Sequence, residues 1–342
     1  MNLYFLPDAA NGSSGHCIEI MRSLKRLNPD ELNTIKIWYT SNTSGEFISK
    51  NDIFLPIHKK WSIQSFYNMF RGRIHTTISK KQLDFLKQYN PASLETIHLE
   101  DPMFYEAVRY YYPNHQLSVH FHNVFLRIKT RCQIFNIKVD YQYYLFLTLF
   151  SNLEKKIFRD PNAKKIFISA EDANFYYELS KCSDYEIWPV TVNQSLTQNI
   201  HNHFIWNRKF IWFGGIKAHK RQSVIYFIDN VFIPLRKLIP NLEFHLWGSG
   251  SNSFDNKSMN IFGHGFYKDS DFPDKDNSLY INPDLTGGGV KLKVKSFLEN
   301  GITFISSPFG FEGYDSSLID NKICHVVPMN CWFDYILNTF NK

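Results

Sequence analysis

Three consecutive glycines followed by lysines form the part of this 342-residue sequence best suited to chemistry: Gly287, Gly288 and Gly289. Residues 278–282 before them are mostly apolar, the pattern of a buried strand, and residues 290–300 after them carry apolar side chains at helical spacing. Backbone amides at a glycine turn and a helix N-terminus bind anions, and Lys293 adds positive charge beside them. The segment therefore predicts a binding site for a diphosphate.

Residues 280–314, YINPDLTGGGVKLKVKSFLENGITFISSPFGFEGY, resemble the donor site of the retaining glycosyltransferases with the GT-B fold (family 4-like, group 1). In that family a strand end with proline leads to GGG, a basic helix and a second strand. The motif Ser/Thr-Pro-x-Gly-x-Glu-Gly then follows, here at residues 307–313. The resemblance implies an α/β fold of two Rossmann-like doubly wound domains that face each other across a cleft, with a nucleotide-sugar donor bound by the second.

The family commonly carries two glutamates separated by seven residues, for the donor sugar and the ribose. Gly288 and Ser296 occupy these positions here, and a serine hydroxyl makes only a weaker neutral hydrogen bond. Glu299, almost one helical turn further on, is a candidate replacement. The resemblance thus places Ser296 and Glu299 in the donor site, together with Lys293 and the three glycines.

A second basic segment, FGGIKAHK at residues 213–220, resembles the loop where the family holds the donor diphosphate with a basic residue. By its position Lys220 is the expected catalytic cation, with Arg221 and Lys217 as alternates and Gly215 beside the donor. A fixed charge there stabilises the departing nucleotide in the transition state. A run of solvated lysines at a helix start is the alternative. Phe266 follows a glycine at the point where relatives contact the nucleobase.

The first half of the chain carries further candidates. Gly12 and Gly15 precede the first predicted helix, where the family's glycine loop faces the donor. His122 resembles a histidine that contacts the transferred sugar in the family, although a histidine at a strand end is as often a structural residue. Glu100 and Asp101 follow a predicted strand, and their position suggests binding of acceptor hydroxyls.

Alternating strands and helices predict two domains, at residues 1–190 and 191–342, and the length suits this division. The stretch LEKKIFRDPNAKKIFISAEDANFY is a second resemblance to the same family, at the close of its first domain. Predicted strands lie at residues 2–6, 35–39, 96–99, 117–121, 165–169, 210–213, 243–247, 260–262, 278–282, 302–306 and 325–328.

Five scattered cysteines without metal spacing, and the absence of a signal-like start or a long apolar run, predict a cytoplasmic protein. A net charge of +6 is compatible with anionic partners. An anionic membrane surface is a candidate partner. The residues expected to bind it are basic, and they follow a group of aromatic residues. The basic residues are Arg71, Arg73, Lys80, Lys81 and Lys87, and the aromatic residues are Trp61, Phe66, Tyr67 and Phe70. Nucleic acid is not expected, because the basic residues do not concentrate in one motif.

Two Asp-x-Asp patterns, at residues 269–271 and 274–276, match the metal ligands of other transferases. They lie in a polar stretch containing proline instead of at the end of an apolar strand, which indicates a surface loop. We therefore expect neither a metal ion nor a cofactor in the reaction.

These features predict a hexosyltransferase-like, retaining, metal-independent glycosyltransferase. Its expected acceptor is a glycan or lipid-linked glycan of a surface polysaccharide, such as the O-antigen of lipopolysaccharide or a capsule. One alternative is a catalytically degenerate relative that binds a glycan or a partner protein. Ser296, at the position where the family commonly has glutamate, favours this alternative. The other is a sugar-nucleotide epimerase, which would need acid–base groups and no acceptor.

Overall fold

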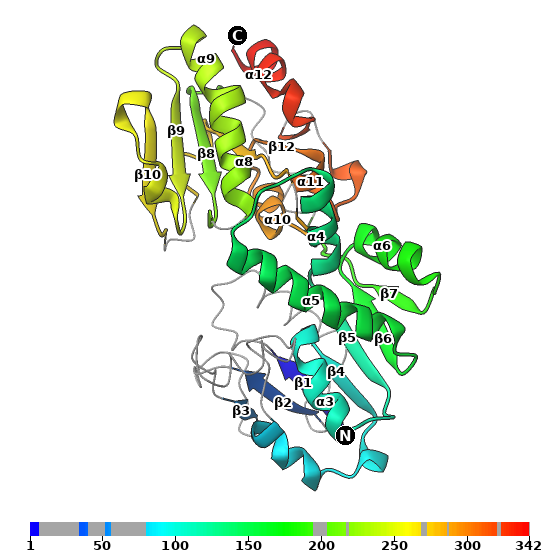
Figure 1. Cartoon of the computed structure of the whole chain (residues 1–342). Coiled ribbons are helices and arrows are strands. Elements are labelled where there is room, and N and C mark those ends of the chain that lie inside the picture. The colour runs from blue at the N-terminus through cyan, green and yellow to red at the C-terminus, as the bar shows by residue number, and fades with distance from the viewer. Residues whose placement is uncertain are drawn as a thin grey trace. The chain divides into compact units, whose positions relative to one another are not determined.

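The computed structural model describes residues 1–6, 34–39, 52–55, 80–193, 204–216, 219–267, 272–285, 287–319 and 323–341, the side chains at 80–82 and 219 excepted. The chain divides into two compact units. The first comprises Met1–Lys129 and Tyr144–Val190, and the second Thr130–Tyr143 and Thr191–Lys342. Each unit is built around its own parallel sheet (Figure 1).

The first sheet has the strand order β3-β2-β1-β4-β5-β6-β7. Its strands are β1 (Asn2–Leu6), β2 (Thr34–Tyr39), β3 (Ile53–Leu55), β4 (Thr96–Leu99), β5 (Leu117–Phe121), β6 (Ala163–Phe167) and β7 (Tyr185–Ile187). The described helices are α3 (Tyr105–Tyr111), α4 (Phe125–Ile134), α5 (Tyr141–Arg159) and α6 (Ala170–Ser180), with a 3₁₀ segment at Lys80–Gln88. The central strands are almost wholly buried, as expected of a parallel sheet.

The second sheet has the order β10-β9-β8-β11-β12-β13. Its strands are β8 (Lys209–Phe213), β9 (Glu243–Trp247), β10 (Ile261–Gly265), β11 (Leu279–Asn282), β12 (Phe304–Ser306) and β13 (Cys324–Val326). The described helices are α8 (His219–Phe227), α9 (Ile233–Leu238), α10 (Leu292–Glu299), α11 (Pro308–Phe311) and α12 (Trp332–Phe340). A π-helical turn, Ile228–Phe232, separates α8 from α9 just before Pro234, which lacks an amide hydrogen for a regular helix.

The expected fold class, two doubly wound α/β domains, is confirmed by these two sheets. In each sheet the strand order reverses once, next to β1 and β4 in the first and next to β8 and β11 in the second. Open α/β sheets bind ligands outside the carboxyl ends of the strands at such a point. These two places are therefore where the fold presents candidate sites.

The predicted strands differ from the observed ones mainly at their ends. β6 ends two residues before the predicted strand because the Ser169 hydroxyl caps α6, accepting a hydrogen bond from the amide of Asp172 at 3.1 Å. The edge strands β3 and β7 were not predicted, since each is only three residues long and incompletely buried.

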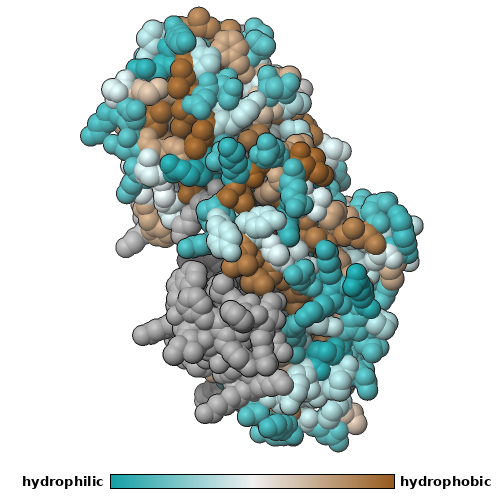
Figure 2. All heavy atoms as spheres, viewed as in Figure 1, coloured by the Kyte–Doolittle hydropathy of each residue, from teal (hydrophilic) through white to brown (hydrophobic). Residues whose placement is uncertain are grey.

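Among the described residues, no helix is long and apolar enough to cross a membrane. On the face shown in Figure 2, hydrophilic and apolar residues are interspersed over the described surface of both units.

Candidate functional site

The glycine run lies where the second sheet reverses its order. Residues 287–289 follow β11, and Gly214 and Gly215 follow the neighbouring strand β8. Gly289 has a φ of +60°, a left-handed conformation that side chains disfavour. A Cβ added to Gly215 would lie 2.9 Å from the hydroxyl oxygen of Ser249, so the turn after β9 packs closely here. Glycines thus let several turns meet at the carboxyl ends of β8 and β11.

Cations hold the carbonyl groups of the glycine turn. The guanidinium of Arg131 donates to the Gly287 oxygen at 2.8 Å, and Lys291 Nζ donates to the Gly288 oxygen at 2.9 Å. Helix α10 then begins at Leu292. These contacts fix the turn that leads into the helix.

The ammonium nitrogen of Lys293 is buried at this place, although the residue as a whole is half-buried. Its Nζ lies 3.9 Å from the ring centroid of Trp212 on β8 and has no hydrogen-bond partner among the described residues. The indole nitrogen of Trp212 donates to the Gly214 oxygen at 2.7 Å, which orients the ring. An ammonium buried against a ring without an acceptor is costly and indicates a place for an anion.

Burial lowers the pKa of Lys293 to about 7, opposed by the charge of Asp284 and reinforced by the charges of Lys220 and Lys291. The fold therefore brings Lys220, in the first turn of α8, close enough to Lys293 for the two ammonium groups to repel each other. Lys220 and Lys291 thus lie near enough to Lys293 for their charges to act on it.

The two residues expected to hold the ribose have protein partners. Ser296 donates its hydroxyl to the Leu292 oxygen, one turn earlier in α10, at 3.3 Å. The Glu299 carboxylate accepts from the Asn193 amide at 3.0 Å and lies 3.2 Å from Lys295 Nζ. A ribose contact through either residue stays a prediction, and it would require these bonds to be exchanged.

Phe266 follows β10 and is 74% exposed. Its ring is accessible for stacking, as a nucleobase contact requires. Asp274, in one of the Asp-x-Asp patterns, is exposed in a turn and pairs with Lys209 at 3.0 Å. The other pattern and the loop carrying Gly12 and Gly15 lie outside the described residues, as does most of the basic aromatic segment.

Arg131 is a residue that the sequence analysis did not single out. Its guanidinium makes two hydrogen bonds to Glu312, at 2.7 and 2.5 Å, and lies 4.7 Å from the ring centroid of Phe309. Glu312 belongs to the Ser-Pro-x-Gly-x-Glu-Gly motif, so this arginine joins the motif to the glycine turn. No local signal marks Arg131, because its partners lie more than 150 residues away.

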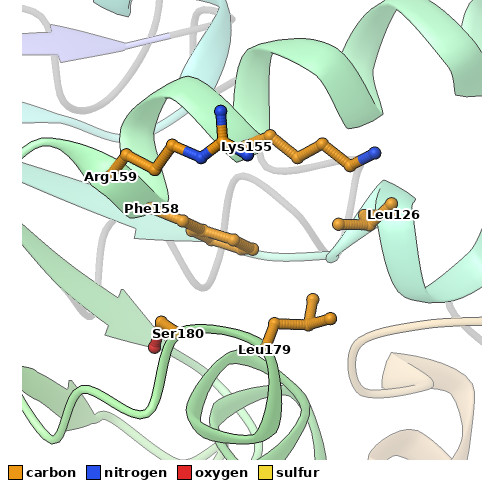
Figure 3. A pocket seen from close by; sticks show the side chains of 6 residues that line it. All are labelled: Leu126, Lys155, Phe158, Arg159, Leu179 and Ser180. Carbon is orange, nitrogen blue, oxygen red and sulfur yellow. The ribbon is translucent and has the colours of Figure 1, made fainter.

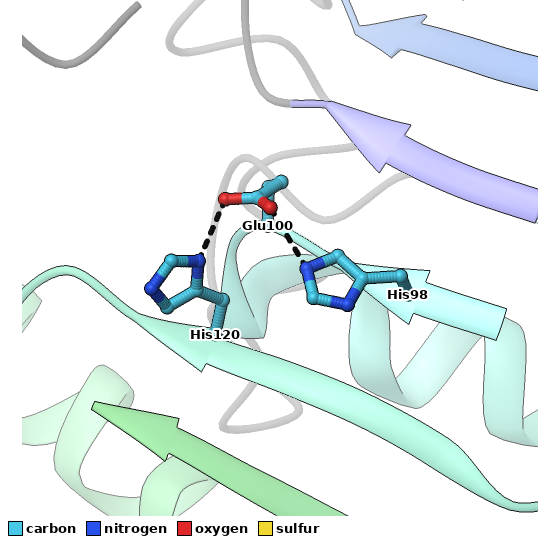
Figure 4. A group of neighbouring side chains, drawn as sticks. All are labelled: His98, Glu100 and His120. Atoms are coloured by element: carbon cyan, nitrogen blue, oxygen red, sulfur yellow. Dashed lines mark hydrogen bonds and ion pairs between the residues drawn. The ribbon is translucent and has the colours of Figure 1, made fainter. Parts of the chain in front are cut away.

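In the first unit, three histidines converge on Glu100 at the carboxyl ends of β4 and β5 (Figure 4 shows two of them). Glu100 Oε1 lies 2.8 Å from His98 Nε2, and Glu100 Oε2 lies 2.9 Å from His120 Nδ1 and 3.0 Å from His122 Nε2. Glu100 is fully buried, and His122, with 8% of its surface exposed, is the most accessible of the four.

Burial by itself would raise the pKa of Glu100. The positive charges of His120 and His98, with hydrogen bonds from His120 and His122, instead hold the pKa of this carboxyl well below its usual range. Glu100 is therefore a buried anion surrounded by imidazoles. This position favours a role in holding the histidines over the expected direct contact with acceptor hydroxyls.

Asp101, the other expected acceptor residue, caps the 3₁₀ turn at Pro102–Phe104, accepting from the Met103 amide at 2.8 Å. Burial raises the pKa of Asp101 to about 6, against the effect of that hydrogen bond and with a contribution from Glu100. Its carboxylate thus has a structural task in addition to any contact with an acceptor.

A shallow pocket in the first unit holds none of the predicted site residues (Figure 3). Leu126, Phe158 and Leu179 supply apolar side chains, and the basic side chains of Lys155 and Arg159 extend along one side. Nothing in the pocket adds to the chemistry at the two strand-end sites.

No protein-family model and no curated protein matches the sequence. Solved structures do match over the whole chain. A UDP-forming α,α-trehalose-phosphate synthase from Burkholderia xenovorans has a TM-score of 0.60 and 9% identity, covering 99% of this chain and 90% of the other. WaaG, described as a glycosyltransferase of lipopolysaccharide biosynthesis, has a TM-score of 0.61 and 9% identity, covering 100% and 91%. TarM has a TM-score of 0.62 and 11% identity, covering 99% and 92%.

At these identities the similarity establishes the fold alone. The two parallel α/β sheets agree with the two doubly wound domains that the resemblance of residues 280–314 implies. The chain therefore has the two-domain fold of the GT-B glycosyltransferases.

Proposed function

We propose that this protein transfers a sugar from a nucleotide-sugar donor to a glycan or lipid-linked glycan. The observation that carries the proposal is the grouping of Lys220, Lys291 and Lys293 beside the glycine turn, where the second sheet reverses its order. Positive charge, a glycine turn and a helix N-terminus together suit a diphosphate. One fold neighbour is described as UDP-forming and another as bound with UDP-2-fluoro glucose, which supports a donor of this class.

In the proposed mechanism the lysines act on the leaving group. Breaking the bond between sugar and diphosphate increases the negative charge on the departing oxygen. Lys220 and Lys293 stabilise that charge more strongly in the transition state than in the ground state. Lysine charge then performs the task that a divalent metal performs elsewhere, so we expect transfer to resist chelators.

We further propose that transfer proceeds with retention at the sugar carbon. The departing phosphate takes the proton of the acceptor hydroxyl on the same face, so this route needs no strong side-chain base. His122, the most exposed member of its cluster, is the proposed contact to the transferred sugar.

A surface polysaccharide is the proposed destination of the sugar. Support comes from the neighbours named WaaG and WaaB, which are described as acting in lipopolysaccharide synthesis. A cytoplasmic location at an anionic membrane face is part of the same proposal.

A degenerate, binding-only relative is the second candidate. The bonds that occupy Ser296 and Glu299 favour it, because no glutamate is then left at the expected ribose position. An epimerase is weaker, since the titratable groups found at the carboxyl ends of β4 and β5 are bound to one another.

The test measures the release of free nucleoside diphosphate from a panel of nucleotide sugars. Each donor is assayed with and without a glycan acceptor fraction, and the assay is repeated with a chelator. We expect chelator-resistant release that depends on the acceptor, together with an extended acceptor. Conversion of the donor sugar without release would indicate the epimerase. Donor binding without any turnover would indicate the degenerate relative.

A further inference from the structure

The cluster of His98, Glu100, His120 and His122 has an arrangement that the proposed transfer does not explain. Side chains two apart in a strand point to the same face, and in neighbouring parallel strands such pairs lie side by side. Leu99 pairs with Val119 in the register of β4 and β5, so the residues after them, Glu100 and His120, lie next to each other. Two strands thus present four ligating side chains at one place.

The cluster encloses one anion and several nitrogen donors. No lysine or arginine pairs with Glu100 among the residues that the structure describes, so its positive partners there are the imidazoles. A buried carboxylate needs compensating charge, which either protonated imidazoles or a bound cation can supply. Imidazole nitrogens with one carboxylate oxygen are the donor set that zinc prefers.

The distances suit such an ion. The donor atoms of His98, Glu100 and His120 all lie within 4.8 Å of one another. A tetrahedral zinc ion with bonds of about 2.0–2.1 Å holds its donors about 3.4 Å apart. The contacts of His98 to Glu100 Oε1 and of His120 to Glu100 Oε2, at 2.8 and 2.9 Å, need to open by about half an ångström for an ion to enter. His122 Nε2 lies 3.0 Å from the same carboxylate and so contacts the cluster through Glu100, outside the group of three ligands.

The surroundings are rigid and largely apolar. The Trp188 ring stacks parallel to His98, with centroids 6.0 Å apart, and the Tyr4 ring lies 5.6 Å from the same imidazole. His98 and Glu100 are fully buried. Because the donors are buried, we expect an ion here to hold the strand ends together and thus stabilise the fold.

We propose that His98, Glu100 and His120 bind one Zn²⁺ ion in the first unit, beside His122. The ion joins the ends of β4 and β5 and fixes the orientation of His122. All the ligands belong to the first unit, so the inference does not depend on the donor site proposed in the second.

The experiment uses the full chain, freed of metal by dialysis against a chelator and then loaded with Zn²⁺ or Co²⁺. After gel filtration, elemental analysis should find about one ion per chain, and Co²⁺ should give the visible d–d absorption of a tetrahedral site. Metal content far below one ion per chain, without cobalt absorption, would overturn the proposal and leave protonated imidazoles as the counter-charge.

Variants locate the ion. Glu100→Gln keeps the shape but removes the charge, and it should weaken Zn²⁺ binding at least tenfold, as should His98→Ala. The matched control is His264→Ala, which removes one member of the histidine pair on β9 and β10 and should leave Zn²⁺ binding unchanged. Loss of zinc in the control with retention in Glu100→Gln would place the ion elsewhere and refute the assignment. If Glu100→Gln does not fold, the wild-type stoichiometry and cobalt spectrum still decide.

Discussion

The ammonium nitrogen of Lys293 lies 3.9 Å from the ring centroid of Trp212, and no described residue accepts a hydrogen bond from it. A cation over an aromatic face gains some electrostatic attraction, which only partly replaces its lost hydration. Lys220 and Lys291 add repulsion at the same place. Without a ligand the protein thus carries a free-energy cost that a bound diphosphate would remove.

Replacing Lys293 by methionine should separate stability from binding. Lys293→Met should leave the melting temperature of the empty protein unchanged or raise it, because an apolar chain of similar volume replaces an unsatisfied buried charge. Nucleotide-sugar affinity should fall at least tenfold, which titration calorimetry measures. The control is Lys295→Met in the same helix, which removes an ion pair with Glu299 and should lower the melting temperature. A lower melting temperature with unchanged affinity for Lys293→Met would assign Lys293 a structural role.

The depressed pKa of Lys293 makes stability and binding depend on pH. Because this pKa is lowered from 10.5 to about 7, the unfolded chain binds more protons between these values, and the free energy of unfolding should rise with pH in that window through this group. Chemical denaturation of wild type and Lys293→Met at several pH values isolates the contribution. An identical pH dependence in both proteins would contradict the low pKa.

The affinity for the donor should fall as pH rises, whereas the free energy of unfolding should rise. A bound diphosphate raises the pKa of Lys293, so the complex takes up a proton and affinity falls as pH rises above about 7. Calorimetry in buffers of different ionisation enthalpy measures the proton uptake directly. A nucleotide sugar is the suitable ligand, since its doubly esterified diphosphate does not titrate near neutrality. Binding without proton uptake would show that Lys293 is already charged in the empty site.

Lys220→Ala should reduce the rate of sugar transfer at least tenfold, equivalent to about 1.4 kcal/mol of transition-state stabilisation, while the protein stays folded. Lys237→Ala, on the exposed side of α9, is the matched control and should keep the wild-type rate. Steady-state kinetics with the donor found in the panel provides the measurement. An unchanged rate would remove Lys220 from the site.

Glu312→Gln should destabilise the protein by about 2–3 kcal/mol, because it leaves the half-buried Arg131 guanidinium without its carboxylate. The double variant Arg131→Met with Glu312→Gln should recover part of this loss, as a double-mutant cycle would measure. The exposed pair of Lys181 and Glu178 is the control, and Glu178→Gln should not change the unfolding midpoint. Equal effects in the two pairs would show that the contact to Arg131 has no special importance.

Ser296→Glu should strengthen nucleotide binding, since it restores a charged acceptor at the position where the family holds the ribose. The Ser296 hydroxyl bonds only within α10, so little local structure is lost. Titration with the preferred nucleotide compares the two proteins. Affinity that stays the same would indicate that the ribose is held elsewhere.

The fold could be predicted because its signals are local. Strands β4, β5 and β9 begin and end where the predicted strands do, and the glycine turn before α10 is visible in the sequence itself. Lys293 could be placed beside that turn for the same reason. The contact of Lys293 with Trp212 could not be predicted, because Trp212 belongs to strand β8, which lies far from Lys293 in the sequence.

The histidine cluster was only partly visible. His122 and Glu100 were noticed one at a time, whereas His98 was missed and the contact between all four depends on the register of β4 with β5. The alternation of polar residues at 98 and 100, and at 120 and 122, at the ends of two strands was the available signal. The pairing of Arg131 with Glu312 joins segments so distant in sequence that no pattern indicates it.

The lysines and glycines of the second unit form the proposed binding site for a nucleotide sugar. It is tested most directly by the thermal stability of the purified chain with UDP, GDP, ADP, CMP and dTDP sugars, each with and without a chelator. A ligand at 100 times its dissociation constant adds about 2.7 kcal/mol to the free energy of unfolding. We predict that one class of donor raises the melting temperature of the wild type, with or without chelator, and has no effect on Lys293→Met. No rise with any donor, or an equal rise in both proteins, would contradict the account.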